Sequence, residues 1–261
     1  MKILIAAKHP PNGAMKIGGV QSWSVTIADQ LRIQGHEVVF WGPELPLPEG
    51  RFERGVFSNF MHTARAAALC DDYVVVSHGV VKDERPGTGR TLYTSEEGRL
   101  HWGTPGSILR QPIDTEFWSP RGFRGNKLVF YSYRAPGLAV GPVTAWRLGL
   151  EFVHIKNVAQ EMARDAMRNA ACVLASGRAA LEAMACGAPV VICDHRAPYQ
   201  SALMDANIER QMKINYSGRG GSAPDVDSLC SAIVSAQDRR DHILLNHDAR
   251  KIAKELMCTF S

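Results

Sequence analysis

The stretch that decides the fold is ACVLASGRAALEAMACGAPVVIC, residues 171–193. Its first part, Ala171–Leu174, is short, apolar and partly β-branched, which predicts a buried strand. A turn of small residues, Ser176–Gly177, precedes a helix predicted over Arg178–Cys186, and the glycine and proline that follow are typical of a helix end. The apolar run Val190–Cys193 predicts the next buried strand. The stretch therefore predicts a strand–turn–helix–strand unit of a parallel sheet.

The turn at Ser176–Gly177 is the place in this unit where a ligand is expected. In open α/β sheets ligands bind beyond the carboxyl ends of the strands, and the N-terminus of the following helix offers N–H groups to an anion. Glu182 comes one turn into the helix, where a carboxylate can reach a ribose hydroxyl while a phosphate lies on the turn. From spacing alone, a plain core segment with a solvated glutamate is an equal alternative.

The N-terminal third predicts a second unit of the same kind. Lys2–Ala7 is a first strand, apolar residues at helical spacing predict a helix over Val20–Ile33, and Glu37–Trp41 is the next strand. The loop before the helix ends in Gly18 and Gly19, where backbone N–H groups can approach a diphosphate. A glycine pair alone is a weak signal, because turns use glycine for several reasons.

The next segment predicts a loop, a helix and a strand. The loop covers Pro43–Arg54, the helix covers Ser58–Leu69, and the strand Asp71–His78 ends in a histidine. Because sites collect at the carboxyl ends of strands, His78 is a candidate site residue. A surface histidine at a strand end is the alternative.

The second half repeats this alternation of strands and helices, which predicts an α/β chain with two Rossmann-like halves. Its further expected elements are strands at Lys127–Tyr131 and Glu151–Ile155 and helices at Pro142–Leu150, Asn157–Asn169, Asp225–Ala236 and His242–Met257.

Composition places few limits on partners. The 261 residues are 45% hydrophobic and 21% charged, enough for one large domain or two small ones. The six cysteines lack metal-type pair spacing, so reduced core thiols and a cytoplasmic location are expected. The N-terminal apolar run is too short for a signal peptide, and no stretch is long enough to span a bilayer. The net charge of +4 permits a polyanionic or membrane-surface acceptor without requiring one.

The run Leu181-Glu-Ala-Met-Ala-Cys-Gly-Ala-Pro-Val-Val191 resembles the nucleotide-sugar motif of GT-B glycosyltransferases, in the large retaining group that includes sucrose-phosphate and glycogen synthases. The run that begins Gly18-Gly-Val-Gln21 resembles the opening of the same family. The resemblance implies a GT-B fold, in which two Rossmann-like domains face a cleft. It implies an acceptor domain at residues 1–117, a donor domain at 118–240, and a C-terminal helix at 241–261 that packs back on the first domain.

The resemblance also implies roles for single residues. Glu182 would bind the nucleotide ribose, His78 would contact the transferred sugar, and Arg134 matches the family arginine that binds the donor diphosphate. A solvated turn arginine is the alternative for Arg134. The catalytic candidates are then His78 and Arg134, and the donor-binding candidates are Gly18, Gly19, Arg134, Val158, Ser176, Gly177, Arg178 and Glu182.

Two departures from the family pattern leave the mechanism open. The family lysine that follows the diphosphate arginine has no counterpart here, and Arg178 is the residue that can replace it. An ungapped comparison puts Leu174 where the first glutamate of the family falls. The short Ser176-Gly-Arg178 turn is closer to peptidoglycan N-acetylglucosamine transferases and UDP-sugar 2-epimerases. Retention or inversion of the anomeric configuration is therefore not predicted.

The predicted activity is transfer of a sugar from a nucleotide diphosphate to a hydroxyl, with a UDP-linked donor favoured over a GDP-linked one. No metal and no further cofactor are expected, since no pair of aspartates ends a strand. A loop over Ser95–Gly103 is expected to face the acceptor, and the acceptor candidates are Glu96, His101, Arg121 and Arg124.

Three other functions stay open. A DNA glycosyltransferase that acts on hydroxymethylated bases, of viral type and working in the host cytoplasm, is favoured modestly by basic residues that include Lys251 and Lys254. A UDP-sugar epimerase of the same fold is the second. A non-catalytic module that binds a nucleotide or a partner is the third.

Overall fold

The structure is a computed structural model, and it describes residues 1–12, 18–122, 124–132, 140–194, 203–205 and 207–260. The chain divides into two compact units. Unit 1 is Met1–Asp114 with His247–Ser261, and unit 2 is Thr115–Asn246. Each unit is an α/β structure built on one mostly parallel sheet, which is the Rossmann-like layering that the sequence predicts. Within the described part of the chain, no helix has the length and apolar character to cross a bilayer.

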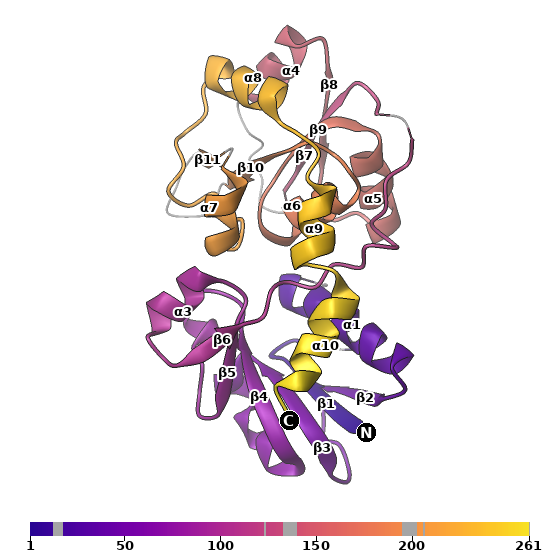
Figure 1. Cartoon of the computed structure of the whole chain (residues 1–261), viewed down its shortest axis with the longest axis vertical. Helices are drawn as coiled ribbons and strands as arrows, with labels where there is room; N and C mark the ends of the chain where they lie inside the picture. Colours follow the sequence, from indigo (N-terminus) through magenta and orange to yellow (C-terminus); the bar gives the residue numbers. More distant parts are fainter. Residues whose placement is uncertain (13–17, 123, 133–139, 195–202, 206, 261) are drawn as a thin grey trace. The chain divides into compact units, whose positions relative to one another are not determined.

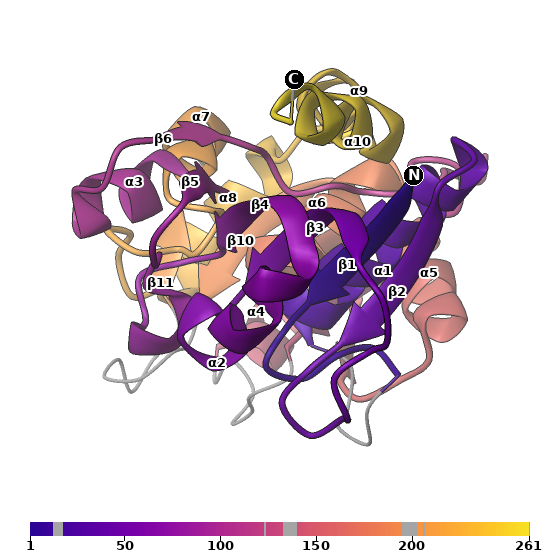
Figure 2. The same cartoon turned by 90° about the horizontal axis from the view of Figure 1, so that it is seen from below.

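Unit 1 holds a six-stranded sheet in the order β2-β1-β3-β4-β5-β6, in which every neighbouring pair is parallel (Figures 1 and 2). Its strands are β1 (Lys2–Ala6), β2 (Glu37–Trp41), β3 (Phe52–Ser58), β4 (Cys70–Ser77), β5 (Arg90–Tyr93) and β6 (Gly106–Ile108). Its helices are α1 (Gly19–Ile33), α2 (Phe60–Thr63), η1 (Ala64–Leu69), η2 (Lys82–Glu84), α3 (Glu96–Trp102) and α10 (Ala249–Cys258).

Both faces of this sheet are covered, as parallel sheets require. On one face, α1 and α10 pack their apolar stripes on the strands, and Trp23, Ile27 and Leu256 are fully buried there. On the other face, α2 and η1 cover a second cluster that includes Trp41 and Phe57. The C-terminal helix is thus part of the core of unit 1.

Unit 2 holds a five-stranded sheet in the order β11-β10-β9-β7-β8, parallel except for β11. Its strands are β7 (Lys127–Tyr131), β8 (Glu151–Ile155), β9 (Ala170–Ala175), β10 (Val190–Asp194) and β11 (Leu203–Asp205). Its helices are α4 (Gly141–Arg147), α5 (Gln160–Arg168), α6 (Gly177–Ala185), α7 (Ile208–Lys213), α8 (Val226–Ser235) and α9 (Arg240–Asn246).

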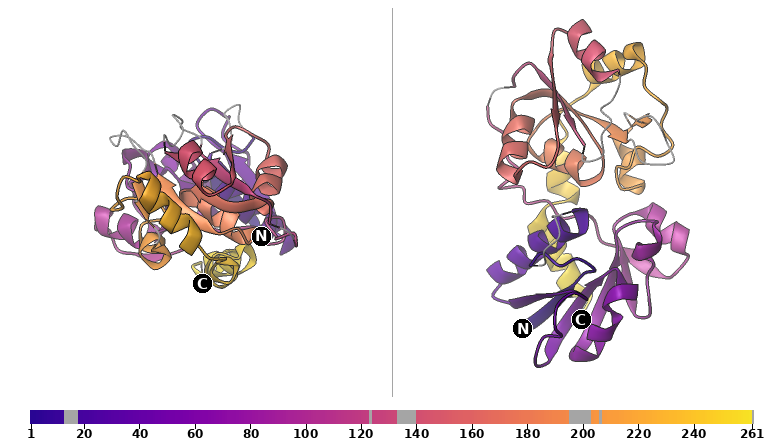
Figure 3. Two further views of the ribbon diagram at one scale, coloured as in Figure 1. Left: turned by 90° about the horizontal axis from the view of Figure 1, so that it is seen from above. Right: turned by 180° about the vertical axis from the view of Figure 1, so that it is seen from behind.

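The two faces of the unit 2 sheet carry different helices (Figures 1 and 3). One face packs on α4 and α8 through a cluster that includes Leu128, Phe130 and Leu174. Helices α5 and α6 pack on each other and on β9, and the buried residues Leu181 and Met184 of α6 lie outside that cluster. Helix α6 therefore covers the opposite face and begins at the carboxyl end of β9.

Four sequence predictions are wrong. The expected loop over Pro43–Arg54 contains the start of β3, and the helix expected from Ser58 begins only at Phe60. The expected loop over Ser95–Gly103 is helix α3, because the Ser95 side chain accepts the Gly98 N–H and caps it. The helix expected over His242–Met257 is two helices, because Asp248 caps a new one.

Candidate functional site

The turn between β9 and α6 is built as a tight, left-handed step. Gly177 has φ +56°, a conformation that glycine adopts without a Cβ clash. Its N–H donates to the Tyr216 carbonyl at 2.6 Å, while the Ser176 side chain makes no capping bond. Tyr216 also has a positive φ, +54°, and its buried phenol lies 2.7 Å from His242 Nε2. The start of α6 is therefore held against the loop that contains Tyr216.

Arg178 and Glu182 form a buried ion pair on the first two turns of α6. Arg178 Nε lies 2.8 Å from Glu182 Oε1, and their side chains are only 10% and 7% exposed. Burial raises the pKa of Glu182, and the charge and hydrogen bond of Arg178 oppose that shift. Glu182 is therefore not a solvated glutamate but a carboxylate held in an apolar helix by one guanidinium.

Tyr131 adds an aromatic side chain to this pair. It ends β7, next to β9 in the sheet. Burial raises the pKa of Tyr131 to about 12, the Glu182 carboxylate adds to the shift, and the Arg178 guanidinium opposes it. The carboxyl edge of this sheet thus holds a buried carboxylate–guanidinium pair beside a glycine turn, within electrostatic reach of the Tyr131 phenol.

No family model matches the sequence, and no curated protein matches it either.

The structure gives less information on two further candidates for donor binding, Val158 and Arg134. Val158 lies in the turn between β8 and α5, beside the exposed Lys156 and Asn157, and is partly buried. Arg134 lies outside the described residues.

Gly18 and Gly19 start helix α1 in unit 1. Gly18 is the N-cap in extended conformation, and its N–H donates to Gln21 Oε1 at 3.0 Å. Both glycines are exposed, and a side chain at Gly19 would meet none of the described residues within 4 Å. The start of α1 is thus exposed. No described part of the protein packs so closely on Gly19 that a glycine is needed there.

His78 lies at the carboxyl end of β4 and is buried, which is not the surface histidine that was the alternative. Its Nε2 lies 2.9 Å from Ser58 Oγ, and its ring contacts Trp23 edge-on at 5.2 Å. Its backbone N–H donates to Glu84 Oε2 at 3.0 Å, and the Asn59 amide donates to Glu84 Oε1 at 3.0 Å. Glu84 therefore joins the ends of β3 and β4 around the histidine.

Glu84 is itself buried, and burial raises its pKa, while the two hydrogen bonds oppose that shift. Neither Glu84 nor Ser58 was predicted as a site residue. Glu84 belongs to a polar stretch with the composition of a surface turn. Its burial depends on the fold around η2 and is not visible in the local sequence.

The acceptor candidates Glu96 and His101 lie on α3. Glu96 pairs with Arg99 at 3.5 Å and with Arg110 at 3.3 Å. His101 is exposed and its ring contacts Trp102 edge-on at 4.6 Å. The structure does not join these two residues in one hydrogen-bonded group.

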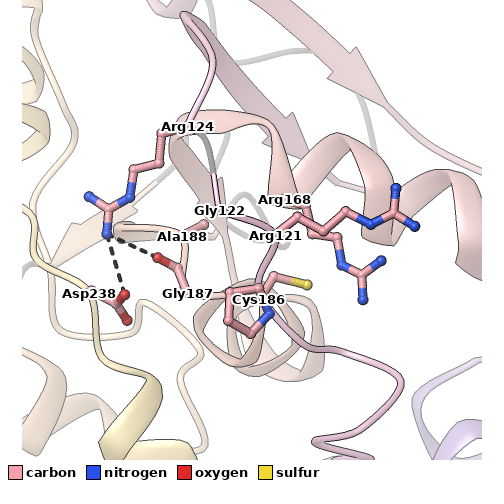
Figure 4. A pocket seen from close by; sticks show the side chains of 9 residues that line it. Arg121, Gly122, Arg124, Arg168, Cys186, Gly187, Ala188 and Asp238 are labelled. Atoms are coloured by element: carbon pink, nitrogen blue, oxygen red, sulfur yellow. Dashed lines mark hydrogen bonds and ion pairs between the residues drawn. The ribbon is translucent and has the colours of Figure 1, made fainter.

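Arg121 and Arg124 lie apart from the Ser176–Gly177 turn of unit 2. With Arg168 they line a cavity of about 150 Å³ between the segment before β7 and the end of α6 (Figure 4). Arg124 donates to the Gly187 carbonyl at 3.2 Å and pairs with Asp238 at 3.3 Å, as the dashed lines in Figure 4 mark. Because β7, β9 and β10 all begin near this cavity, it lies at the amino edge of the sheet, opposite the Ser176–Gly177 turn.

Among the described residues, no group of His, Cys, Asp and Glu side chains is arranged to hold a metal ion. The basic residues Lys251 and Lys254 are exposed on α10 in unit 1.

Proposed function

We propose that the protein is a glycosyltransferase of the GT-B type that transfers a sugar from a nucleotide diphosphate to a hydroxyl acceptor. The observation that carries the proposal is the buried Glu182–Arg178 pair on α6, directly after a glycine turn at the carboxyl end of β9. That is the edge of a parallel sheet where nucleotides bind. A carboxylate that the protein keeps buried at this edge is an acceptor for ribose hydroxyls.

In this proposal each group has a defined task. Glu182 accepts hydrogen bonds from the ribose, and backbone N–H groups at the start of α6 face the diphosphate. The departing diphosphate gains negative charge as the bond to the sugar breaks, so guanidinium and N–H donors aimed at it lower the barrier. Arg178 and Arg134 are the proposed cations. His78, fixed by Ser58 and by Glu84, is the proposed contact to the transferred sugar.

Nucleotide binding is the first test. Calorimetric titration of UDP and GDP into the wild type and into Glu182→Gln should show binding to the wild type that is at least about tenfold weaker in the variant, because a charged acceptor is replaced by a neutral one. Glu209→Gln is the matched control, since Glu209 is an exposed glutamate of the same unit and should leave affinity unchanged. Equal affinity in wild type and Glu182→Gln would remove Glu182 from the site.

Turnover is the second test. Labelled nucleotide sugars are incubated with the protein and with glycan, small-molecule or hydroxymethylated DNA acceptors. Transfer of label to any acceptor supports the proposal, and the acceptor that is labelled separates DNA from the others. Conversion of the sugar without transfer identifies an epimerase, and nucleotide binding without turnover identifies a non-catalytic module.

A further inference from the structure

Tyr131 is placed by the sheet beside the start of α6. The parallel register pairs Phe130 with Leu174 of β9, so Tyr131 stands level with Ala175, just before the Ser176–Gly177 turn. Phe130 belongs to the core cluster on the face of α4 and α8. Because side chains alternate along a strand, Tyr131 faces the opposite side, which α6 covers.

The Tyr131 hydroxyl has no hydrogen-bond partner among the described residues. Tyr131 is only partly buried, and its hydroxyl is not among the fully enclosed polar atoms that lack a partner. Its surroundings include the charges of Glu182 and Arg178. A phenol with a partly buried ring, within electrostatic reach of a carboxylate and a guanidinium, is suited to a polar ligand.

The chemistry of a ribose hydroxyl explains why a phenol belongs next to a carboxylate. A hydroxyl has one proton to donate and two lone pairs that accept. A carboxylate takes the proton and can give nothing back, so the hydroxyl oxygen still needs a donor. Burial keeps the pKa of Tyr131 far above neutral, so its O–H stays protonated and can donate.

We propose that the Tyr131 hydroxyl donates a hydrogen bond to a ribose hydroxyl that Glu182 accepts from, so that unit 2 selects ribonucleoside over deoxyribonucleoside diphosphates. This inference rests on the proposed function, because it takes the nucleotide as the ligand. A site built to hydrogen-bond a hydroxyl rejects an analogue that lacks it, because its own polar groups are then left unpaired.

The test titrates UDP, 2′-deoxy-UDP and 3′-deoxy-UDP into the wild type and into Tyr131→Phe. The wild type should bind one of the two deoxy analogues more weakly than UDP. Tyr131→Phe should bind UDP about fivefold more weakly, the size of one net hydrogen bond, and lose about the same factor of discrimination against that analogue. The control is Tyr73→Phe, which removes a hydroxyl that bonds the Thr88 carbonyl at 3.2 Å in unit 1 and should change neither quantity.

The outcomes separate the inference from the proposed function. Equal UDP affinity in wild type and Tyr131→Phe, with nucleotide binding intact, overturns the tyrosine contact alone. A uniform loss for all three ligands in the variant also overturns it, because a packing role would act that way. Absence of discrimination in the wild type overturns the inference without any variant. Absence of UDP and GDP binding in the wild type overturns both.

Discussion

In the variant Arg178→Met, Glu182 keeps its burial and loses the cation that it pairs with. Methionine retains an unbranched apolar stem of similar reach, so the change removes the charge with little change of volume. The Arg178 and Glu182 side chains are only 10% and 7% exposed, so water cannot replace the guanidinium well. The variant therefore measures how much of the stability of unit 2 depends on that one contact.

The magnitude follows from two bounds. Two unit charges 2.8 Å apart attract by about 6 kcal/mol at an effective dielectric constant of about 20, and desolvation offsets much of this. Loss of one partner of a buried pair costs about 3–5 kcal/mol. The unpaired carboxyl can escape that cost by taking up a proton. Starting from its ordinary pKa of 4.5, protonation of Glu182 at pH 7 costs about 3.4 kcal/mol, at about 1.36 kcal/mol per unit, so the penalty cannot exceed this value by much.

Because the cost of protonating Glu182 depends on pH, the destabilisation caused by Arg178→Met should depend on pH as well. In the variant the folded-state pKa of Glu182 lies above its unfolded value, so the folded protein holds the proton to higher pH, and stability falls as the pH rises between the two values. At pH 5.5 the cost of protonation is about 1.4 kcal/mol, about 2 kcal/mol less than at pH 7. Hydrogen exchange of β9 and α6 reports the opening free energy of unit 2 separately from unit 1.

A companion variant separates charge from packing. Arg178→Met with Glu182→Leu removes both charges and should return within about 1 kcal/mol of wild-type stability, because an apolar pair of similar volume replaces a buried ion pair at little cost. If Arg178→Met alone were as stable as the wild type at both pH values, the pair would be solvated and the argument for Glu182 as a buried acceptor would be refuted.

Two further predictions concern unit 1. Glu84→Ala should lower its stability by about 2–3 kcal/mol in urea unfolding, because it leaves the buried His78 N–H without its acceptor and the Asn59 amide with only the Asp83 carbonyl. Because burial raises the pKa of Glu84, the wild type should lose stability as the pH rises through the folded-state pKa of this carboxyl. Glu84→Ala should lack this loss, and a variant whose stability changes with pH as in the wild type would contradict the prediction. Asp248→Ala should cost about 1 kcal/mol, seen as a lower midpoint of thermal unfolding, because the Asp248 side chain accepts the Arg250 and Lys251 N–H groups at the start of α10. An unchanged midpoint would show that water caps the helix equally well.

The predictable part of the fold is the part with a strong local signal. The segment from Ala170 to Asp194 forms the strand, glycine turn, helix and strand that its composition predicts, because apolar runs, Gly187 and Pro189 leave few alternatives. Strand β3 was missed, because Phe52–Ser58 mixes charged residues and a glycine with only a few apolar ones. It is a strand because β1 and β4 pair with it on both sides, and that pairing is a tertiary effect.

The candidate site divides in the same way. Glu182 and His78 could be named as candidates from sequence, because each follows a local pattern. Glu182 lies one turn into a helix that follows a glycine turn, and His78 ends an apolar strand. Tyr131, Glu84 and Ser58 could not be predicted, because the residues that they meet in the fold lie elsewhere in the chain. Glu84 meets Asn59, and Ser58 meets His78. Tyr131 meets α6 only through the register of β7 with β9.

In the proposed nucleotide site, the Arg178–Glu182 pair would link the ribose of the ligand to its diphosphate. The sequence offers Arg178 as a replacement for a missing phosphate cation, yet the structure commits its Nε–H to Glu182 at 2.8 Å. The guanidinium cannot leave to follow a phosphate without stranding a buried carboxylate, which costs several kcal/mol. In the proposed site, a phosphate contact would therefore have to form with the pair intact. Under the proposed function, a ligand that holds ribose and diphosphate in one molecule would engage both ends of the pair and would stabilise unit 2 as it binds. A free ribose or a free phosphate would engage only one end, and we expect it to give only part of that stabilisation.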